Sequence, residues 1–273
     1  MAEDPATRTL FDAQAASFQS RAGLPQDVRE RVAAALIDLG GLREGRLVVD
    51  IGAGTGDIGL ELLARGIGYV GIDVSDGMLQ VFRGAAAAAG LHPSLVVADA
   101  AAPWPVPAGA AGLVFGSRSL HWLDPRHVAE QAFRAASPRG SRLLIGRVVR
   151  DPTSPKQRAR RAMRQLLSRD GIEGRSGKRS AAAIVEECLL RGGVHVPSRV
   201  VATWTARGSI RDSIEAWRGK PGLAGTDVAE TAKERILGEL SRFTSEAFGN
   251  IDTLVESTEQ YVLEGATLIA DGT

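Results

Sequence analysis

The chain has 273 residues, a formal net charge of +1 and 44% hydrophobic residues. This length allows one or two domains, and the composition excludes disorder, collagen and coiled coil as descriptions of the whole chain. The single cysteine, Cys188, excludes an intrachain disulfide and a zinc cluster built from thiolates. No apolar run reaches the length of a membrane span, and the acidic N-terminus is unlike a signal peptide, so we expect a cytoplasmic location.

Helices and strands alternate over the first 150 residues. Amphipathic or capped segments predict helices at 26–39, 57–65, 76–89 and 125–136. Short apolar runs predict buried strands at 47–51, 69–73, 95–98, 113–115 and 142–149. This spacing is typical of βαβ units and predicts an α/β fold with a doubly wound, mostly parallel sheet.

The remaining elements follow a different pattern. Helices are predicted at 155–169, at 181–191, from the Ser209 capping box onward, and at 227–248. Strands are predicted at 200–206 and 261–269, which brings the expected sheet to seven strands.

A glycine-rich loop joins the first predicted strand to the next helix. The segment VVDIGAGTGD (48–57) lets the backbone turn sharply, lets a ligand approach the main chain, and presents free N–H groups that favour an anion. Asp73 and Asp99 end the second and third strands, at the sheet edge where open α/β folds bind ligands. A carboxylate at Asp73 can accept both ribose hydroxyls, and one at Asp99 can accept from an adenine amine. The pattern predicts a nucleotide-like ligand.

With these residues the chain resembles the class I S-adenosylmethionine-dependent methyltransferases, in the subgroup that acts on small molecules. The segments that carry the resemblance are VVDIGAGTGDIG (48–59), VGIDVS (70–75), ADA (98–100), LVFGSRSLHWLD (113–124) and ASPRGSRLLIG (136–146). Together they cover about residues 45–147, and the segment FDAQAASF (11–18) is similar to the lid ahead of the first motif. Five motifs in order are more specific than the glycine loop alone.

The resemblance implies a Rossmann-like fold, S-adenosylmethionine as cofactor and S-adenosylhomocysteine as its product. The residues that it implies in cofactor binding are Asp50, Gly52, Ala53, Gly54, Thr55, Gly56, Asp73, Val74, Met78, Asp99, Ala100, Ser117 and Arg21. The glycine loop would surround the methionine part, Asp73 would hold the ribose, and Asp99 with Ala100 would contact the adenine. Arg21, with Phe11 and Phe18, would close over the site.

The same resemblance implies a domain organisation. Residues 1–44 would form an N-terminal helical lid, and residues 45–150 the cofactor-binding core. Residues 151–273 would supply substrate-cap helices, at 151–192 and 207–258, together with the last strands of the same sheet.

Two other functions compete with methyl transfer. Residues 54–59 also read G-x-G-x-x-G, the fingerprint of an NAD(P)-dependent oxidoreductase. Against it, Asp50 stands where a dinucleotide fold usually has an apolar residue. The Tyr-x-x-x-Lys pair of short-chain dehydrogenases is also missing, because the residues four positions after Tyr69 and Tyr261 are Asp73 and Gly265. A non-catalytic protein that binds S-adenosylmethionine is the second alternative.

The segment after the fourth strand supplies the candidates for chemistry. His121 is the best-placed general base for an acceptor that must lose a proton, and packing against the cofactor is its alternative role. We expect Trp122 to pack in the core and His127 to be solvated. No cluster of His, Asp and Glu has the spacing of metal ligands, so we expect no metal.

Charge is unevenly distributed along the chain. Residues 150–180 carry a net charge of +7 and residues 225–264 a net charge of −6. Arg158, Arg160, Arg161 and Arg164 either form a solvated helix face or attract an acidic acceptor, such as a carboxylate, a phosphate or a carrier-bound intermediate. The near-zero net charge disfavours nucleic acid as a partner. The expected partner is a small molecule whose acceptor atom, O, N, C or S, the sequence leaves open.

Overall fold

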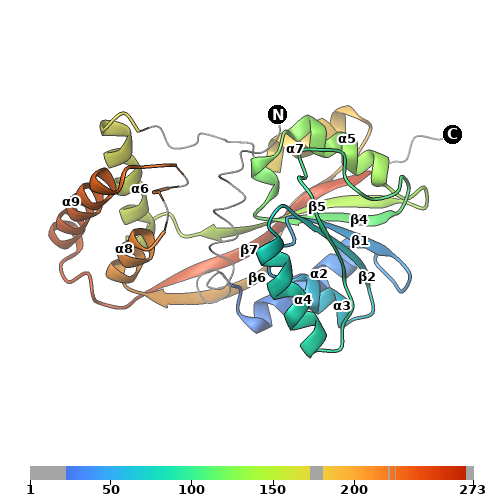
Figure 1. Cartoon of the computed structure of the whole chain (residues 1–273), viewed down its shortest axis with the longest axis horizontal. Coiled ribbons are helices and arrows are strands. Elements are labelled where there is room, and N and C mark those ends of the chain that lie inside the picture. Colours follow the sequence, from blue (N-terminus) through green and yellow to red (C-terminus); the bar gives the residue numbers. More distant parts are fainter. Residues whose placement is uncertain (1–22, 173–180, 221, 225, 269–273) are drawn as a thin grey trace. The chain divides into compact units, whose positions relative to one another are not determined.

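The computed structural model describes residues 23–172, 181–220, 222–224 and 226–268 (Figure 1). Its seven-stranded sheet has the order β3-β2-β1-β4-β5-β7-β6. The strands are β1 (Leu47–Ile51), β2 (Gly68–Asp73), β3 (Ser94–Val97), β4 (Ala111–Ser117), β5 (Ser141–Arg150), β6 (Val194–Gly208) and β7 (Val255–Leu268). The four pairings among β1 to β5 are all parallel. The α/β class and the seven strands expected from the sequence are confirmed.

Strand β1 lies between β2 and β4, so the strand order reverses beside it. In such sheets the crevice beyond the carboxyl ends of the strands, at the reversal, is the usual ligand site. The sheet therefore places the glycine loop after β1 where a ligand is expected.

The helices agree with the predicted ones to within a few residues. They are α2 (Gln26–Gly40), α3 (Gly59–Leu63), α4 (Asp76–Ala88), α5 (Pro125–Ala135), α6 (Pro155–Arg169), α7 (Ala181–Leu190), α8 (Ile210–Arg218) and α9 (Glu230–Phe248), with a 3-10 turn η1 (Leu120–Trp122). Asp124 caps α5 by accepting from the N–H groups of Arg126 and His127, and Ser209 and Asp212 form the predicted capping box of α8.

Strands β6 and β7 are longer than the sequence predicts. The prediction began them at 200 and 261, whereas the structure begins them at 194 and 255. Their added residues are mostly exposed or half-buried, so they lack the continuous apolar run that marks a buried strand.

The chain divides into two compact units. Among the described residues, the first comprises 23–148, 181–202 and 261–268, and the second comprises 149–172, 203–220, 222–224 and 226–260. This division differs from the three consecutive segments predicted from the sequence. The units are not consecutive in the chain because β5, β6 and β7 each contribute residues to both of them.

Helix α7 is a correction to the predicted cap. Its Ile184, Val185 and Cys188 are buried in the core cluster of the first unit, which also contains α5 and strand residues. Helices α5 and α7 lie on one face of the sheet and α2, α3 and α4 on the other (Figure 1). The apolar side of α7 therefore covers the sheet instead of a substrate.

Helix α2 is a second correction, to the predicted lid over 1–44. It buries Val28, Val32 and Leu36 completely and contacts α3, so it is part of the packed core of the first unit. The rest of the predicted lid, residues 1–22, lies outside the described residues.

The second unit has a core of its own. Apolar side chains of α6, α8 and α9 form one cluster, with Met163, Ile214 and Leu237 among its most buried members. Across α6 and α9, Arg169 pairs with Glu239 at 2.7 Å, and Arg235 pairs with Asp170. The basic and acidic segments seen in the sequence therefore neutralise one another in part within this unit.

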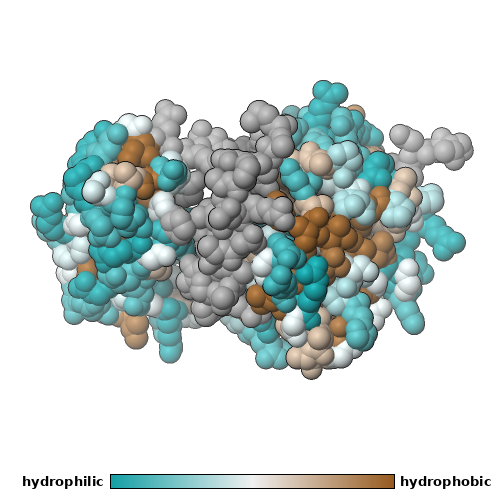
Figure 2. Space-filling model, viewed as in Figure 1, coloured by the Kyte–Doolittle hydropathy of each residue, from teal (hydrophilic) through white to brown (hydrophobic). Residues whose placement is uncertain are grey.

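Hydrophobic residues also reach the surface of the first unit. Figure 2 shows them gathered in brown between α4 and α5. Among the described residues, no helix combines the length and apolarity needed to cross a bilayer.

Candidate functional site

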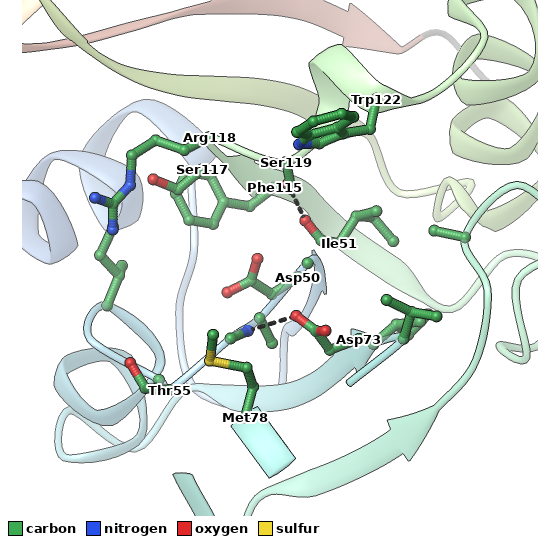
Figure 3. Close-up of a pocket in the computed structure, with 18 of the residues that line it drawn as sticks. Asp50, Ile51, Thr55, Asp73, Met78, Phe115, Ser117, Arg118, Ser119 and Trp122 are labelled. Atoms are coloured by element: carbon green, nitrogen blue, oxygen red, sulfur yellow. Dashed lines mark hydrogen bonds between the residues drawn. The ribbon is translucent and has the colours of Figure 1, made fainter. Parts of the chain in front are cut away.

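A cavity in the first unit lies beyond the carboxyl ends of β1, β2 and β4 (Figure 3). Twelve of the thirteen predicted cofactor residues line it, namely Asp50, Gly52, Ala53, Gly54, Thr55, Gly56, Asp73, Val74, Met78, Asp99, Ala100 and Ser117. The thirteenth, Arg21, lies outside the described residues, as do Phe11 and Phe18. Residues predicted from four separate motifs, together with Met78, thus meet around one space.

The three predicted glycines have different roles. A Cβ at Gly52 would lie 2.3 Å from the side chain of Ser119, and one at Gly56 would lie 2.3 Å from the ring of Phe82. These two glycines therefore permit close packing. A Cβ at Gly54 would meet nothing within 4 Å, so Gly54 alone of the three borders open space. All three have positive φ angles, between 56° and 82°, which favour glycine.

Asp50 is the most buried carboxylate of the cavity, with 4% of its surface exposed. Its Oδ2 accepts a hydrogen bond of 2.7 Å from the Tyr69 hydroxyl, whereas Oδ1 is buried and has no partner among the described residues. Burial raises the pKa of Asp50 to about 7, the Tyr69 hydrogen bond opposes this rise, and the charge of Asp73 adds to it. A buried, unpaired carboxylate oxygen at a cavity wall favours a cationic or hydrogen-bond-donating ligand.

Asp73 ends β2 and holds the loop as well as lining the cavity. Its Oδ2 accepts from the N–H of Gly54 at 2.8 Å, and its Oδ1 accepts from the N–H of Ser75 at 2.9 Å. A carboxylate offers about four acceptor positions, so Asp73 can accept from more donors than these two N–H groups. Figure 3 shows Asp73 facing the cavity opposite Asp50.

The end of β3 contributes the other side of the cavity. Asp99 accepts from the N–H of Ala101 at 2.8 Å, which turns the chain directly after the strand. His127 Nε2 lies 3.0 Å from the carbonyl oxygen of Ala100 and 3.2 Å from that of Ala102. The prediction that His127 is solvated is therefore wrong, because its ring nitrogen holds this turn in place.

Ser117 lies at the carboxyl end of β4, with a hydroxyl 2.6 Å from that of Tyr261. Tyr261 is fully buried, and burial raises the pKa of its phenol well above the ordinary value. The next residue, Arg118, also lines the cavity and has φ 61°, in the left-handed region that arginine seldom adopts. This turn directs the chain out of the sheet and along the rim of the cavity.

Two sequence expectations for η1 differ from the structure. Trp122 is 37% exposed and lines the cavity, so the prediction of core packing is wrong. His121 is exposed and is not among the lining residues, although partial desolvation lowers its pKa. The centroids of the two rings are 5.0 Å apart. The apolar face of Trp122, instead of the imidazole, borders the site.

Ten lining residues were not among the sequence candidates. They are Ile51, Asp57, Ile58, Ile72, Ala98, Phe115, Arg118, Ser119, Trp122 and Leu123. Most are neighbours of predicted residues in the chain and belong to the quoted motifs, so their position beside a predicted residue could have identified them.

Asp57 is the most informative of these residues, because its Oδ2 accepts from the N–H of Leu24 at 3.3 Å and its Oδ1 is buried without a partner among the described residues.

The basic helix α6 is partly engaged within the second unit. Arg158 lies over the ring of Phe248, 4.6 Å from its centroid, and Arg161 donates to the carbonyl of Pro152. Burial, together with the charges of Arg164 and Arg150, lowers the pKa of Arg160.

No group of three or more His, Cys, Asp and Glu suited to a metal ion occurs in the part of the chain that the structure describes.

Comparison with known sequences identifies the segment that builds this cavity. Residues 48–140 match the family described as methyltransferase domain. An uncharacterized methyltransferase of Mycobacterium tuberculosis is 30% identical over 100 residues, which are 37% of this chain and 39% of the relative. The match thus spans about two fifths of the length of the curated relative.

Comparison with solved structures extends the likeness to the whole fold. The structure of the [4+2]-cyclase SpnF is 17% identical, with a TM-score of 0.62 over 97% of this chain and 96% of that one. A geranyl diphosphate methyltransferase in complex with S-adenosylmethionine is 16% identical, with a TM-score of 0.50 over 96% of this chain and 92% of that one. At these identities the likeness shows the fold alone.

Proposed function

We propose that this chain, which belongs to the class I S-adenosylmethionine-dependent methyltransferase family through residues 48–140, transfers a methyl group from S-adenosylmethionine to a small molecule. One observation carries the proposal. Every predicted cofactor residue that the structure describes lines the same cavity at the switch point of the sheet.

The side chains of the cavity suit the parts of this cofactor. Asp50 offers its unpaired Oδ1 to the ammonium of the methionine part, and Gly54 leaves open space for the chain that carries it. Asp73 offers acceptor capacity to the ribose hydroxyls. Ile72 and Ala98 supply an apolar wall suited to the adenine, and Asp99 supplies an acceptor for its amine.

The reaction requires little acid or base catalysis from the protein. When bound, the cofactor supplies a methyl group on a positively charged sulfur, which is already activated for displacement. The residues of the chain must then orient the two reactants and exclude water. Phe115 and Trp122 are suited to this work, because both present aromatic surface to the cavity. A general base is not part of this proposal, because His121, the residue predicted for that role, does not line the cavity.

The class of acceptor is proposed from charge. The segment 150–180 has a net charge of +7, which suits an anionic small molecule or an intermediate carried on an acidic protein. Arg161 and Arg164 of α6 have exposed side chains. If they attract the acceptor, raising the salt concentration should raise the KM of the acceptor, since exposed charges are screened within about 8–10 Å.

Calorimetric titration with S-adenosylhomocysteine tests the cofactor. We expect one site per chain and no comparable affinity for NAD or NADP. Incubation with methyl-labelled S-adenosylmethionine and a metabolite extract then tests transfer, with label expected in a small molecule. Tight binding of NADP without a response to S-adenosylhomocysteine would replace this proposal by an oxidoreductase, and binding without transfer would leave a non-catalytic cofactor-binding protein.

A further inference from the structure

Tyr69 lies on β2 with 4% of its surface exposed, and it contacts the cavity only through another residue. Its hydroxyl donates to Asp50 Oδ2 at 2.7 Å, and its ring packs edge-on against Phe82, with centroids 5.7 Å apart. β1 and β2 are paired in register, with Val48 opposite Tyr69 and Asp50 opposite Gly71. The strand pairing and the ring contact therefore fix where the hydroxyl points.

This hydrogen bond leaves the two oxygens of Asp50 in different situations. Oδ2 has its partner in Tyr69, whereas Oδ1 is buried without one among the described residues. A carboxylate held at one oxygen cannot turn its second oxygen away from the cavity without losing the first bond. The cost of leaving a charged Oδ1 unpaired is removed when a ligand supplies a donor or a cation, or when Asp50 takes up a proton.

We propose that Tyr69 is a positioning residue for cofactor binding: its hydroxyl holds Asp50 oriented, so that Oδ1 receives the ammonium of the cofactor's methionine part. This inference rests on the proposed function. It adds a residue outside the cavity and a pH dependence to the same site.

The pH dependence follows from the burial of the pair. Burial raises the pKa of Asp50 to about 7, and the hydrogen bond from Tyr69 counteracts part of that rise. Burial and the charge of Asp50 keep Tyr69 itself a neutral donor, because they raise the pKa of its phenol. Near neutral pH a proton and a cationic ligand therefore compete for Asp50.

Other groups around the cavity carry charge or titrate. Among the described residues these include Asp73 on β2, Asp57 after β1, Asp99 after β3 and Arg118 after β4, which line the cavity, and Tyr261 on β7, which is coupled electrostatically to Asp50. A pH effect is therefore assigned to Asp50 only if Asp50→Asn abolishes it.

The experiment is a titration of the full chain with S-adenosylhomocysteine between pH 5.5 and 7.5, below the ordinary pKa of an α-amino group. The wild-type affinity should increase as the pH is raised, by up to about tenfold per pH unit below pH 7. Methylthioadenosine, which lacks the ammonium and the carboxylate, should bind independently of pH. Asp50→Asn should bind S-adenosylhomocysteine weakly and without this pH dependence.

Tyr69→Phe keeps the ring and removes only the hydroxyl. Loss of the hydroxyl should move the rise in affinity to higher pH, so that binding weakens about eightfold at pH 6.5 and only about threefold at pH 7.5, as for a pKa raised by one unit. In the ligand-free protein, the carboxyl carbon of Asp50 should titrate near pH 7 by NMR and higher in Tyr69→Phe. This second readout does not depend on binding.

The outcomes separate the two proposals. If wild-type protein does not bind S-adenosylhomocysteine at pH 7.5, the proposed function fails. If it binds with an affinity that is flat between pH 5.5 and 7.5, or if Tyr69→Phe weakens binding by the same factor at every pH, the proposed function stands and the positioning role of Tyr69 is overturned.

Discussion

The backbone N–H of Gly54 donates a 2.8 Å hydrogen bond to Oδ2 of Asp73 and so ties the glycine loop to the end of the neighbouring strand. Asp73 therefore shapes the cavity that it also lines. Its second oxygen accepts from Ser75 and fixes the turn into α4 in the same way. A ligand that bonds to Asp73 meets a carboxylate already oriented by two backbone donors.

Replacement of Asp73 tests both of these roles. Asp73→Ala should cost about 2–4 kcal/mol of S-adenosylhomocysteine binding, because ribose hydroxyls and the Gly54 N–H both lose an acceptor. Calorimetry measures the loss. Asp76→Ala is the matched control, since Asp76 is nearby, half-exposed and paired with Arg83 on the surface. Wild-type affinity in Asp73→Ala would disprove the ribose role.

Gly54 and Gly41 allow backbone strain to be separated from steric blocking. Both have left-handed backbone, with φ 56° and 59°, and a Cβ at either would meet nothing within 4 Å. Gly54→Ala and Gly41→Ala should each lose about 1 kcal/mol of stability, which thermal unfolding measures. Only Gly54→Ala should also weaken S-adenosylhomocysteine binding, by at least about tenfold, and Gly54→Val should abolish it. Equal binding by the two alanine variants would show that Gly54 does not border the ligand.

His121 and Trp122 both differ from the roles that the sequence suggests for them. Since Trp122 lines the cavity and His121 does not, Trp122→Ala should raise the KM of the acceptor several-fold. His121→Ala should change turnover by less than about threefold, far from the 10²–10⁴-fold loss typical of a removed general base. Steady-state kinetics on the acceptor decides between them. A large loss of turnover in His121→Ala, with unchanged cofactor affinity, would restore the base.

Asp50 should lower the stability of the ligand-free protein. Its pKa of about 7 in the folded state exceeds the ordinary value of 3.8, so the folded state binds the proton more tightly than the unfolded state. The stability contribution of this group therefore falls as the pH rises from about 4 to 7. Asp50→Asn should unfold at a higher temperature than wild type at pH 8, and the difference should shrink toward pH 4. A difference that does not depend on pH would contradict this account.

Cys188 reports on the packing of α7. It is completely buried, and burial raises the pKa of its thiol to about 11. Because the thiolate is the reactive form, the folded protein should not react with a thiol reagent such as Ellman's reagent at pH 8. One thiol per chain should react after denaturation in guanidinium. Rapid reaction of the native protein would mean that α7 does not cover the core.

The sequence by itself determined the motifs of the site and the elements that carry them. The run from β1 through Gly52, Gly54 and Gly56 into α3, and the acidic residues at the ends of β2 and β3, are local patterns. Each depends on turn geometry and hydrophobic periodicity within a few residues, which a sequence displays directly. For this reason the first five strands and twelve lining residues could be predicted.

Only the tertiary structure decided which of these residues pack against neighbours, which border the cavity and which pair with one another. That Gly56 packs on Phe82 while Gly54 borders open space depends on where α4 crosses the loop, and the pairing of Asp50 with Tyr69 depends on the register of β1 and β2. The assignment of α7 to the core likewise depends on which face of the sheet its apolar side meets. These relations join residues far apart in the chain, and burial, which sets the pKa of Asp50, exists only once the chain has folded.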